Sequence, residues 1–370
     1  MVDDPESAAQ PQRATESAET IPHHTVRARG VPALWGLGAV AFLVGSRLLA
    51  LGTGPVAIGW GGVTGSVLSH VPLLHIHSPL SAVDEAILWQ LRAPRIVLAA
   101  LVGGMLAIAG SAYQGVFRNP LADPYLLGVA AGAGLGATLA ISYTSADNRW
   151  NELLPLAAFA GAVIAVTAAY MLGRAVGGIH NTGTLILAGV TVAAFMTAAQ
   201  TFLQQQHSET LREVYSWLLG GFGGATWQDV ALVTPYIAVS VVIILLHRRV
   251  LDVLRLGDEE AATLGLNVRR VRLLLVVAAT AGTAAAVAVS GLIGFVGIIV
   301  PHTVRLLVSA SYRAVVPLSL LVGAGFLVLA DVVARTVLSP DELPIGVVTA
   351  FFGAPFFAVV LRTTGRIGVS

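Results

Sequence analysis

Residues 91–137 read LRAPRIVLAALVGGMLAIAGSAYQGVFRNPLADPYLLGVAAGAGLGA. Two apolar runs lie in this stretch, and a short turn that contains Pro120 and Pro124 separates them. A helix of about 20 apolar residues matches the hydrocarbon thickness of a bilayer. Because runs of this kind recur along nearly the whole chain, the sequence predicts an all-α membrane protein.

Ten such runs can be counted, at roughly 33–51, 95–115, 124–143, 153–173, 184–204, 227–246, 271–290, 295–309, 314–334 and 344–362. We therefore predict ten transmembrane helices. The run at 295–309 is short for a span and contains Pro301, so we expect it to be broken or tilted. Irregular backbone is tolerated at membrane depth only where it is buried in protein or lines a cavity.

Composition supports this fold class and excludes several kinds of chemistry. Hydrophobic residues make up 56% of the 370 residues and charged residues only 11%, and the mean hydropathy is +0.81. The net charge of +1 implies neither an acidic partner nor a nucleic acid. The absence of cysteine excludes disulfides and thiolate metal sites. All basic residues are arginine, so the chain lacks the lysine of a phosphate-binding loop, and any ATP must be hydrolysed by another polypeptide.

Domain organisation and orientation follow from the charged residues. Residues 1–30 are polar and acidic, and we interpret them as a disordered cytoplasmic tail that precedes a transmembrane domain at 31–370. With the N-terminus inside, fifteen arginines fall in or beside cytoplasmic loops and six fall outside. This bias predicts a multi-pass protein with both termini in the cytoplasm.

Segments 95–130 and 271–305 resemble each other weakly. Each has an Ala/Gly-rich run, a Gly/Pro interruption and another apolar run, and with ten spans the two segments run in opposite directions. Inverted repeats are common in transporters, which place their sites near the repeat interface. Ala/Gly richness alone also produces self-similarity, so the repeat stays one of two interpretations.

Three segments have residues suited to function, each with a plainer alternative. Arg92 and Arg95 lie before the second run and suit either carboxylates on a partner or lipid headgroups. The turn at 114–124 forms either a plain loop or the lining of a translocation path. The stretch 247–272 carries charges of both signs around a short helical pattern that begins at Asp258–Glu260. It is either a surface helix on the headgroups or a docking element for a cytoplasmic partner.

Other polar residues favour structural roles. Asp331 and Arg335 are one helical turn apart and predict an intrahelical ion pair rather than a proton relay. No metal site is predicted: His70, His75 and His77 fit a solvated outer loop, and His302 fits a hydrogen bond within the bundle. No nucleophile motif supports intramembrane catalysis, so we predict no catalytic residue.

At these segments the sequence resembles the FecCD-type permeases, the membrane subunits of importers for ferric siderophores, haem and cobalamin. The matching stretches are 91–137, LILAGV at 185–190, LGDEEAATLGL at 256–266, SGLIGFVGIIVPHTVRLL at 290–307 and LADVVARTVLSPDELPIGVVTAFFGAPFF at 329–357. The resemblance covers about residues 33–362. It implies a type II ABC importer permease with ten transmembrane helices in two inverted five-helix halves.

The resemblance also implies partners and the residues that meet them. A second permease copy, identical or related, forms the dimer. Two ATPase subunits bind the ATP and dock inside on a loop that matches 251–270. An extracytoplasmic substrate-binding protein docks outside on the arginines that match Arg92, Arg95 and Arg335. The inner gate matches Asn119 and Leu121, with Thr182 as a third member. Within the ATPase-docking loop, the matching residues are Leu254, Asp258, Glu259, Ala262, Leu264 and Gly265.

This resemblance predicts the import of a ferric siderophore or haem across the cytoplasmic membrane, with cobalamin as the alternative cargo. The chain itself binds no cofactor in this interpretation. The scarcity of charge in the apolar runs predicts a largely apolar conduit that suits a bulky chelate. A secondary transporter is the alternative from another class, and an intramembrane enzyme is a distant third.

Overall fold

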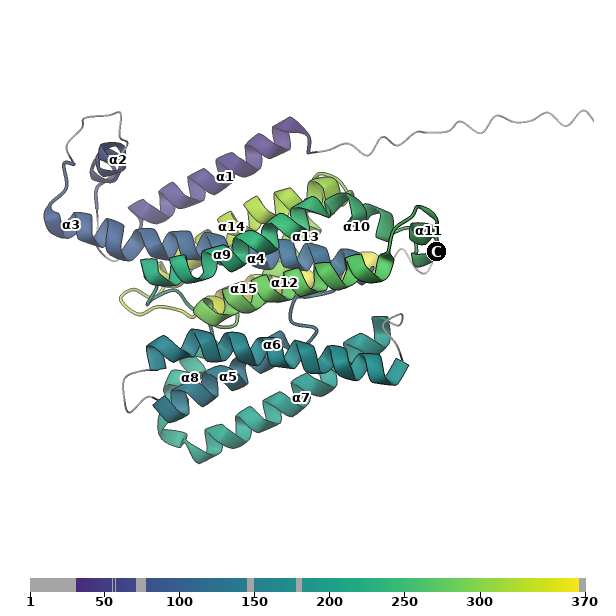
Figure 1. The fold of residues 1–370 in the computed structure, drawn as a ribbon. Coiled ribbons are helices and arrows are strands. Elements are labelled where there is room, and N and C mark those ends of the chain that lie inside the picture. Colours follow the sequence, from purple (N-terminus) through teal and green to yellow (C-terminus); the bar gives the residue numbers. More distant parts are fainter. Residues whose placement is uncertain are drawn as a thin grey trace, which may run out of the picture.

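The computed structural model describes residues 31–54, 56, 58–70, 78–144, 150–177 and 182–365, and every regular element in these ranges is helical (Figure 1). The predicted acidic tail at 1–30 lies outside the described residues. The elements are α1 (Ala33–Gly52), α2 (Trp60–Ser69), α3 (Ala82–Ala86), η1 (Ile87–Arg92), α4 (Ala93–Val116), α5 (Val129–Thr144), α6 (Trp150–Gly177), α7 (Thr182–Gln206), η3 (Ser208–Thr210), α8 (Leu211–Leu218), α9 (Trp227–Leu246), α10 (Arg248–Leu254), α11 (Asp258–Thr263), α12 (Val268–Ser290), α13 (Val296–Leu307), α14 (Tyr312–Thr336) and α15 (Ile345–Gly365).

The ten predicted spans correspond to ten of these helices. Among the described residues, seven helices are long and apolar enough to cross a membrane, and α5, α13 and the part Ile345–Val360 of α15 form shorter apolar helical segments. The predicted start of the third span at residue 124 is wrong, because α5 begins only at Val129 after a proline-containing turn. The second span begins earlier than predicted, since η1 and α3 extend α4 back to Ala82.

The ends of the helices follow local chemistry. Thr226 and Asp229 bond each other's backbone N–H groups in a capping box at the start of α9. The side chain of Asn267 accepts a hydrogen bond from the Arg270 N–H at the start of α12. Pro94 falls in the first turn of α4, directly after the π-helical turn of η1. Proline has no N–H, so the helix that continues from Ala82 loses one backbone hydrogen bond here, next to the π-helical turn.

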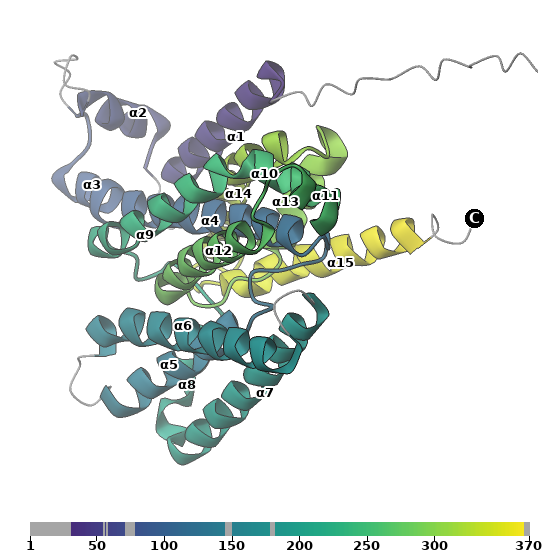
Figure 2. The ribbon, with the colours of Figure 1, turned by 45° about the vertical axis from the view of Figure 1, so that its right-hand side comes forward.

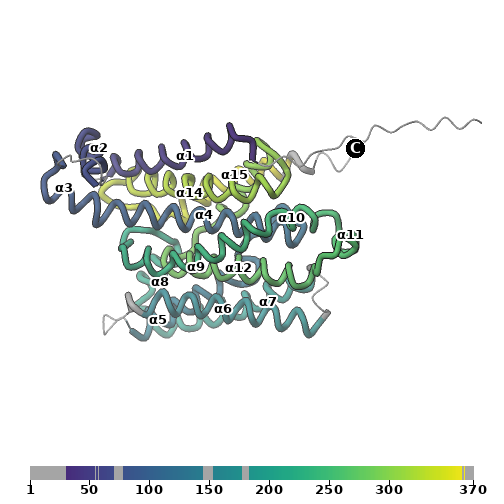
Figure 3. The backbone as a smooth tube through the Cα atoms, turned by 45° about the horizontal axis from the view of Figure 1, so that its top comes forward, coloured from purple at the N-terminus to yellow at the C-terminus, as the bar shows by residue number. Residues whose placement is uncertain are grey.

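The bundle has two ends with different short helices (Figure 1). One end carries α2, α3 and α8 and is called the α8 end. The opposite end carries α10 and α11 and is called the α11 end. Helix α1 begins and α15 terminates toward the α11 end (Figures 1 and 3).

The ten spans divide into two halves of five. The first half contains α1, α4, α5, α6 and α7, and the second contains α9, α12, α13, α14 and α15. In each half an irregular segment separates the second span from the third, at 117–128 and at 291–295. Helix α4 runs from the α8 end toward the α11 end, whereas α12 runs in the opposite direction (Figure 1). The predicted inverted arrangement is therefore present.

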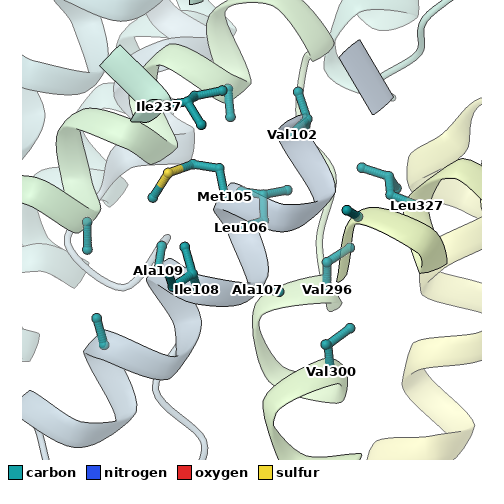
Figure 4. Close-up of a cluster of buried hydrophobic side chains, with 14 of the residues drawn as sticks. Val102, Met105, Leu106, Ala107, Ile108, Ala109, Ile237, Val296, Val300 and Leu327 are labelled. Atoms are coloured by element: carbon teal, nitrogen blue, oxygen red, sulfur yellow. The ribbon is translucent and has the colours of Figure 1, made fainter. Parts of the chain in front are cut away.

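Helix α4 forms the centre of the molecule. In the most apolar stretch of 18 residues, 89% of the residues are buried in the span that contains α4 and 17% in α1. Helix α1 faces outward. Figure 4 shows α4 side chains such as Val102 and Met105 between Ile237 of α9, Val296 of α13 and Leu327 of α14. Gly110 permits the closest approach, because a Cβ there would overlap the Gly297 carbonyl of α13.

Helices α5, α6, α7 and α8 form a second layer beneath this core (Figures 1 and 2). Small residues allow α5 and α6 to pack tightly, since a Cβ on Gly132 would overlap the backbone of Gly161. Such close packing of small residues is typical of membrane helices. A second buried cluster of Ala and Val side chains joins this layer to α12 through residues such as Ala284 and Val287. The irregular segment 117–128 connects the two layers.

Candidate functional site

A buried ion network at the α8 end joins three parts of the chain. The Arg95 guanidinium of α4 donates to both carboxylate oxygens of Asp331, with Nε–O distances of 3.0 and 3.1 Å and an Nη2–Oδ1 distance of 2.8 Å. Its Nη1 and Nη2 also donate to Glu342, at 2.8 and 2.9 Å. Glu342 lies in the loop that joins α14 to α15. Every nitrogen of the Arg95 guanidinium is thus bonded to a carboxylate.

Two further arginines hold the C-terminal end of α1. Arg335 donates to the Ala50 carbonyl at 2.7 Å. Arg92 donates to the Leu51 carbonyl at 2.7 Å and also to the Val56 carbonyl. The last carbonyls of a helix lack partners within the helix and carry partial negative charge. These two guanidinium groups therefore stabilise the end of α1 and fix it to α4 and α14.

The predicted ion pair between Asp331 and Arg335 is present, with 3.6 Å between Oδ2 and Nε. The sequence did not reveal that Arg95, 236 positions earlier in the chain, is the closer partner of Asp331. Arg92, Arg95 and Arg335 are only 5%, 9% and 3% exposed. All three arginines that were predicted to dock a binding protein have partners within the chain. Their docking role stays a prediction.

A cavity of about 560 Å³ opens beside this network at the α8 end. Its lining includes Arg95 and Glu342 together with Arg212, Glu213 and Asp229. Arg212 lies on α8 and is exposed, so it is an accessible arginine at this end. Sequence reasoning assigned it no role, although the amphipathic pattern LREVYSWL at 211–218 indicates a surface helix.

The turn between α4 and α5 is built from two Asx–Pro pairs. Asn119 Oδ1 accepts from the Leu121 N–H at 2.9 Å, and Asp123 Oδ1 accepts from the Tyr125 N–H at 2.8 Å. Proline supplies no N–H at the intervening position, so each side chain bonds the residue two positions on. The predicted turn between the two apolar runs is confirmed. Asn119 and Leu121, predicted as gate residues, shape the same turn.

The two irregular segments meet each other inside the molecule. The Tyr125 hydroxyl donates to the Ile293 carbonyl at 3.1 Å and accepts from the Ile293 N–H at 3.2 Å. Gln114 Nε2 donates to the Gly297 carbonyl at 3.1 Å. These bonds satisfy backbone groups that the broken helices leave unpaired. Pro301 lies inside α13, and the break before this helix lies at 291–295, with Phe295 at a φ of 67°.

Two adjoining cavities extend along α7 next to this turn. They measure about 460 and 590 Å³ and share Tyr125, Ala193 and Thr197. The larger reaches Asp123, and the smaller is lined in addition by Gln200, Thr201 and Gln204. The wall is neutral apart from Asp123 and mostly apolar, as predicted, and hydroxyl and amide groups lie among its apolar side chains.

Asp123 is the charged group of this wall. Burial raises the pKa of its carboxyl to about 6, although the hydrogen bond from the Tyr125 N–H opposes this shift. Thr182, the third predicted gate residue, is the first residue of α7. About two turns further on, Gly189 brings the α7 backbone against Leu126 in the α4–α5 turn.

At the α11 end, Asp258 connects three elements. Its carboxylate lies 2.9 Å from Nη2 of Arg272 in the first turns of α12, and 3.5 Å from Nη2 of Arg118 in the α4–α5 turn. Asp258 itself begins α11, which ends at Thr263, and Gly265 adopts a φ of +82° after it. The predicted helix is confirmed. Sequence reasoning gave Arg118 and Arg272 no such role.

The predicted ATPase-docking residues differ in exposure. Glu259, Ala262, Leu264 and Gly265 are exposed, and Leu264 is 64% exposed. Leu254 is instead fully buried in the main core, so its side chain cannot reach a docking surface. A groove of about 360 Å³ lies between α11 and α12, lined by residues that include Asp258, Ala262 and Arg272.

The histidines do not assemble into a metal centre in the part of the chain that the structure describes. The His70 ring packs against Trp89 with 4.2 Å between ring centroids. His302 packs edge-on against Phe356 at 5.9 Å, in place of the predicted hydrogen bond. His75 and His77 lie outside the described residues.

Ten spans in two halves, two irregular segments that meet beside a mostly apolar cavity, and a short helix at one end are the arrangement expected of a transport permease. A family model described as the FecCD transport family matches residues 42–363, so the chain belongs to this family. It is the membrane permease of an ABC importer in the cell membrane, a class that functions with ATPase subunits, a substrate-binding protein and a second permease. The secondary-transporter alternative is thereby excluded.

Three similar proteins illustrate this membership. The chain is 39% identical to the cobalamin import system permease BtuC of Halobacterium salinarum, over 94% of this chain and 91% of the relative. It is 38% identical to the hemin transport system permease HmuU of Yersinia pestis, over 74% of this chain and 82% of the relative. A solved structure described as an inward-facing metal-chelate type ABC transporter matches with a TM-score of 0.75 and 30% identity, covering 90% of this chain and 99% of that one.

Proposed function

We propose that this permease imports a ferric chelate, a siderophore complex or haem, by alternating access. The mostly apolar cavity wall along α7, with Asp123 as its one carboxyl and with hydroxyl and amide groups among its side chains, is the observation that carries this proposal. Two adjoining volumes of about 460 and 590 Å³ suit a bulky cargo with its own polar groups. A bare cation would need a cluster of carboxylates or histidines, and the described residues contain no such group.

Cobalamin is the alternative cargo, and a specific observation favours it. The amides of Gln200 and Gln204 are available on the wall, and cobalamin carries amide side chains of its own. The Halobacterium relative, which matches over 94% of this chain, is a cobalamin permease. The hemin permease of Yersinia is nearly as similar. Cargo must therefore be decided by transport measurements.

The α11 end is the proposed cytoplasmic side, where the segment 251–270 receives the ATPase. The groove beside α11 and the exposed side chain of Leu264 offer a surface for a partner. Movement of α11 would reach the gate through Asp258, because its carboxylate is shared between Arg118 in the turn and Arg272 in α12. In this proposal, ATPase movement reaches the turn when the Asp258 carboxylate shifts between its two partners, Arg118 and Arg272.

The α8 end is the proposed outer side, where the binding protein docks. Arg95 is occupied on one edge by buried Asp331 and on the other by Glu342, whose side chain is 40% exposed. A carboxylate on the binding protein would therefore have to replace Glu342. Exposed Arg212 offers a second guanidinium beside the same cavity.

A second permease copy would complete the pathway. The cavities along α7 are open on one side, and Thr197 and Thr201 on their wall are exposed in the single chain. The amide of Gln204 also lines this wall, and an amide facing lipid would lack hydrogen-bond partners. A second copy facing this side would enclose a shared polar path.

Uptake by a strain deleted for this gene tests the cargo. The strain is offered radiolabelled ferric siderophore, haem and cobalamin in turn, and complementation uses the wild-type chain and Gln200→Leu. We expect loss of iron-chelate uptake, which the wild type restores and the variant restores only in part. Loss of cobalamin uptake alone would replace the cargo and keep the importer mechanism.

A further inference from the structure

A small pocket at the α11 end gathers three arginines from separate parts of the chain. It measures about 300 Å³ and is lined by residues that include Arg118, Arg255 and Arg305. Arg118 follows α4, Arg255 follows α10, and Arg305 lies in the last turn of α13. Gln114 and Tyr312 add polar groups to the lining. We call this the three-arginine pocket.

The cations of this pocket lack matching anions. Arg305 donates to the amide oxygen of Gln114 and, at 3.3 Å, to the hydroxyl of Tyr312, both of which are neutral. Arg255 donates to the Ala310 carbonyl at 2.8 Å. Only Arg118 reaches a carboxylate, at 3.5 Å, and that carboxylate also serves Arg272.

The nearest further acid is already occupied. Asp252 accepts from the Ser311 hydroxyl at 2.7 Å and from the Tyr312 N–H at 2.7 Å, and it lies 3.6 Å from Arg313. It therefore stabilises the start of α14 and does not line the pocket. Three positive charges around about 300 Å³ repel one another unless an anion joins them.

The geometry points to a phosphate group as the ligand of the three-arginine pocket. Guanidinium forks suit phosphate and carboxylate oxygens. A phosphate has more oxygens to share among three guanidinium groups than the two of a carboxylate. The phosphate of an anionic lipid headgroup and free phosphate have this chemistry in common. The inference concerns the α11 end and is independent of the cargo.

A phosphate in this pocket would join moving parts of the permease. Arg118 belongs to the α4–α5 turn with the predicted gate residues, Arg255 belongs to the segment proposed to dock the ATPase, and Arg305 belongs to α13. The bound anion would hold the turn, the docking segment and α13 in one arrangement. When the anion is released, Arg118 would keep only its ion pair with Asp258.

Binding is tested on the purified permease–ATPase complex in detergent after removal of native lipid. Native mass spectrometry counts phosphatidylglycerol and phosphatidylcholine molecules retained in a titration. A parallel thermal melt with inorganic phosphate, against chloride at equal ionic strength, tests the free anion. The variants are Arg255→Gln, which removes an exposed charge, and Arg305→Lys, which keeps the charge but removes the fork. Arg249→Gln removes an exposed arginine that lies outside the pocket and is the matched control.

We expect about tenfold weaker binding in either pocket variant, equivalent to about 1.4 kcal/mol, and no change in the control, since each variant removes charge-assisted hydrogen bonds to the anion. Selective loss of phosphatidylglycerol identifies a lipid as the source, and a lost response to inorganic phosphate identifies the free anion. If the pocket variants bind both probes as the wild type does, the proposal is wrong. It is also wrong if they lose only the ATPase, because the pocket then receives a protein side chain.

Discussion

The two ends of the bundle use arginine in opposite ways. At the α8 end, the Arg95 side chain is 11% exposed and its partner Asp331 only 1%, with 2.8 Å between Nη2 and Oδ1. At the α11 end, Arg118 and Asp258 are 44% and 34% exposed and lie 3.5 Å apart. The Arg95 pair is closed, and every nitrogen of its guanidinium is bonded, whereas the Arg118 pair is open and long. The Arg118–Asp258 pair is therefore the one better suited to the change of partners that we propose.

The energies of the two kinds of pair differ accordingly. Removing one partner of a buried pair costs about 3–5 kcal/mol, because the other charge stays buried without compensation. An exposed pair contributes about 0–1 kcal/mol and weakens with salt. The α8 end is thus suited to hold α1, α4 and α14 together, and the α11 end is suited to respond to a partner.

Among single substitutions at these charged residues, Asp331→Asn should have the largest effect on stability. Asparagine keeps the shape but leaves Arg335 without a carboxylate in the buried network, and it leaves Arg95 with Glu342 alone. We expect a loss of about 3–5 kcal/mol of stability. The measurement is the apparent melting temperature and the yield of monodisperse protein in detergent.

Asp341→Asn is the control for this variant, since Asp341 is an exposed acid of the neighbouring loop. Its melting temperature should equal that of the wild type. Equal melting of Asp331→Asn and the control would mean that the α8 end is not the rigid part of the molecule, and the contrast between the two ends would fail.

Asp123→Asn tests a charge that lies between the two ends. The folded pKa of about 6 lies above the ordinary pKa of 3.8 for an aspartate, so the folded chain holds this proton more tightly than the unfolded chain. Its stabilising contribution is therefore complete below pH about 4 and is lost as the pH rises to about 6. Asparagine preserves the acceptor for the Tyr125 N–H and does not ionise.

We expect Asp123→Asn to be more stable than the wild type by about 1–3 kcal/mol at pH 7.5 and equal to it near pH 4. Melting temperatures across this range provide the measurement. Tyr125 is the other titratable residue of the larger cavity wall, and burial raises its pKa, so it stays neutral throughout. A constant difference between the two chains at all pH values would contradict the raised pKa.

Asp258→Asn should change coupling, and its loss of stability should be smaller than that of Asp331→Asn, because the Asp258 side chain is 34% exposed. The pair with Arg118 is exposed, so losing that contact should cost about 1 kcal/mol or less. The 2.9 Å pair with Arg272, whose side chain is only 8% exposed, should cost more, because that guanidinium stays buried without a carboxylate. If the carboxylate transmits ATPase movement to the turn, reconstituted transport per ATP hydrolysed should fall several-fold while ATPase binding persists. Glu259→Gln, on the same helix but more exposed, is the control. Equal transport per ATP in both variants would show that the route does not pass through Asp258.

The ten spans could be predicted from the lengths of the apolar runs, because the hydrocarbon thickness of a bilayer sets the length and the apolar character of a spanning helix. Turn chemistry was also local: Asn119 and Asp123 bond residues two positions away, so their arrangement could be predicted from the Asx–Pro pairs. The short helices α2 and α8 escaped prediction, since α8 has only 8 residues and no bilayer constraint.

Long-range partners could not be predicted from the sequence. Arg95 and Asp331 are 236 positions apart, and Tyr125 and Ile293 are 168 apart. Spacing within one helix identified the weaker partner of Asp331 and missed the stronger. Leu254 shows the same limit, because its place in the predicted docking segment did not reveal that its side chain is buried in the core.

Glu342→Gln should have the smallest effect on stability and gives the sharpest test of docking. Its side chain is 40% exposed, and Arg95 keeps Asp331 when Glu342 is neutralised. We expect a loss of about 1 kcal/mol or less. If a carboxylate of the binding protein takes the Glu342 edge of Arg95, neutralisation removes its competitor, and the binding protein should dock several-fold more tightly. Surface plasmon resonance on the complex in nanodiscs measures this affinity, with Asp341→Asn as the control. Weaker docking would instead make Glu342 itself a contact of the binding protein, and unchanged docking would leave Arg95 with the structural role alone and direct attention to exposed Arg212.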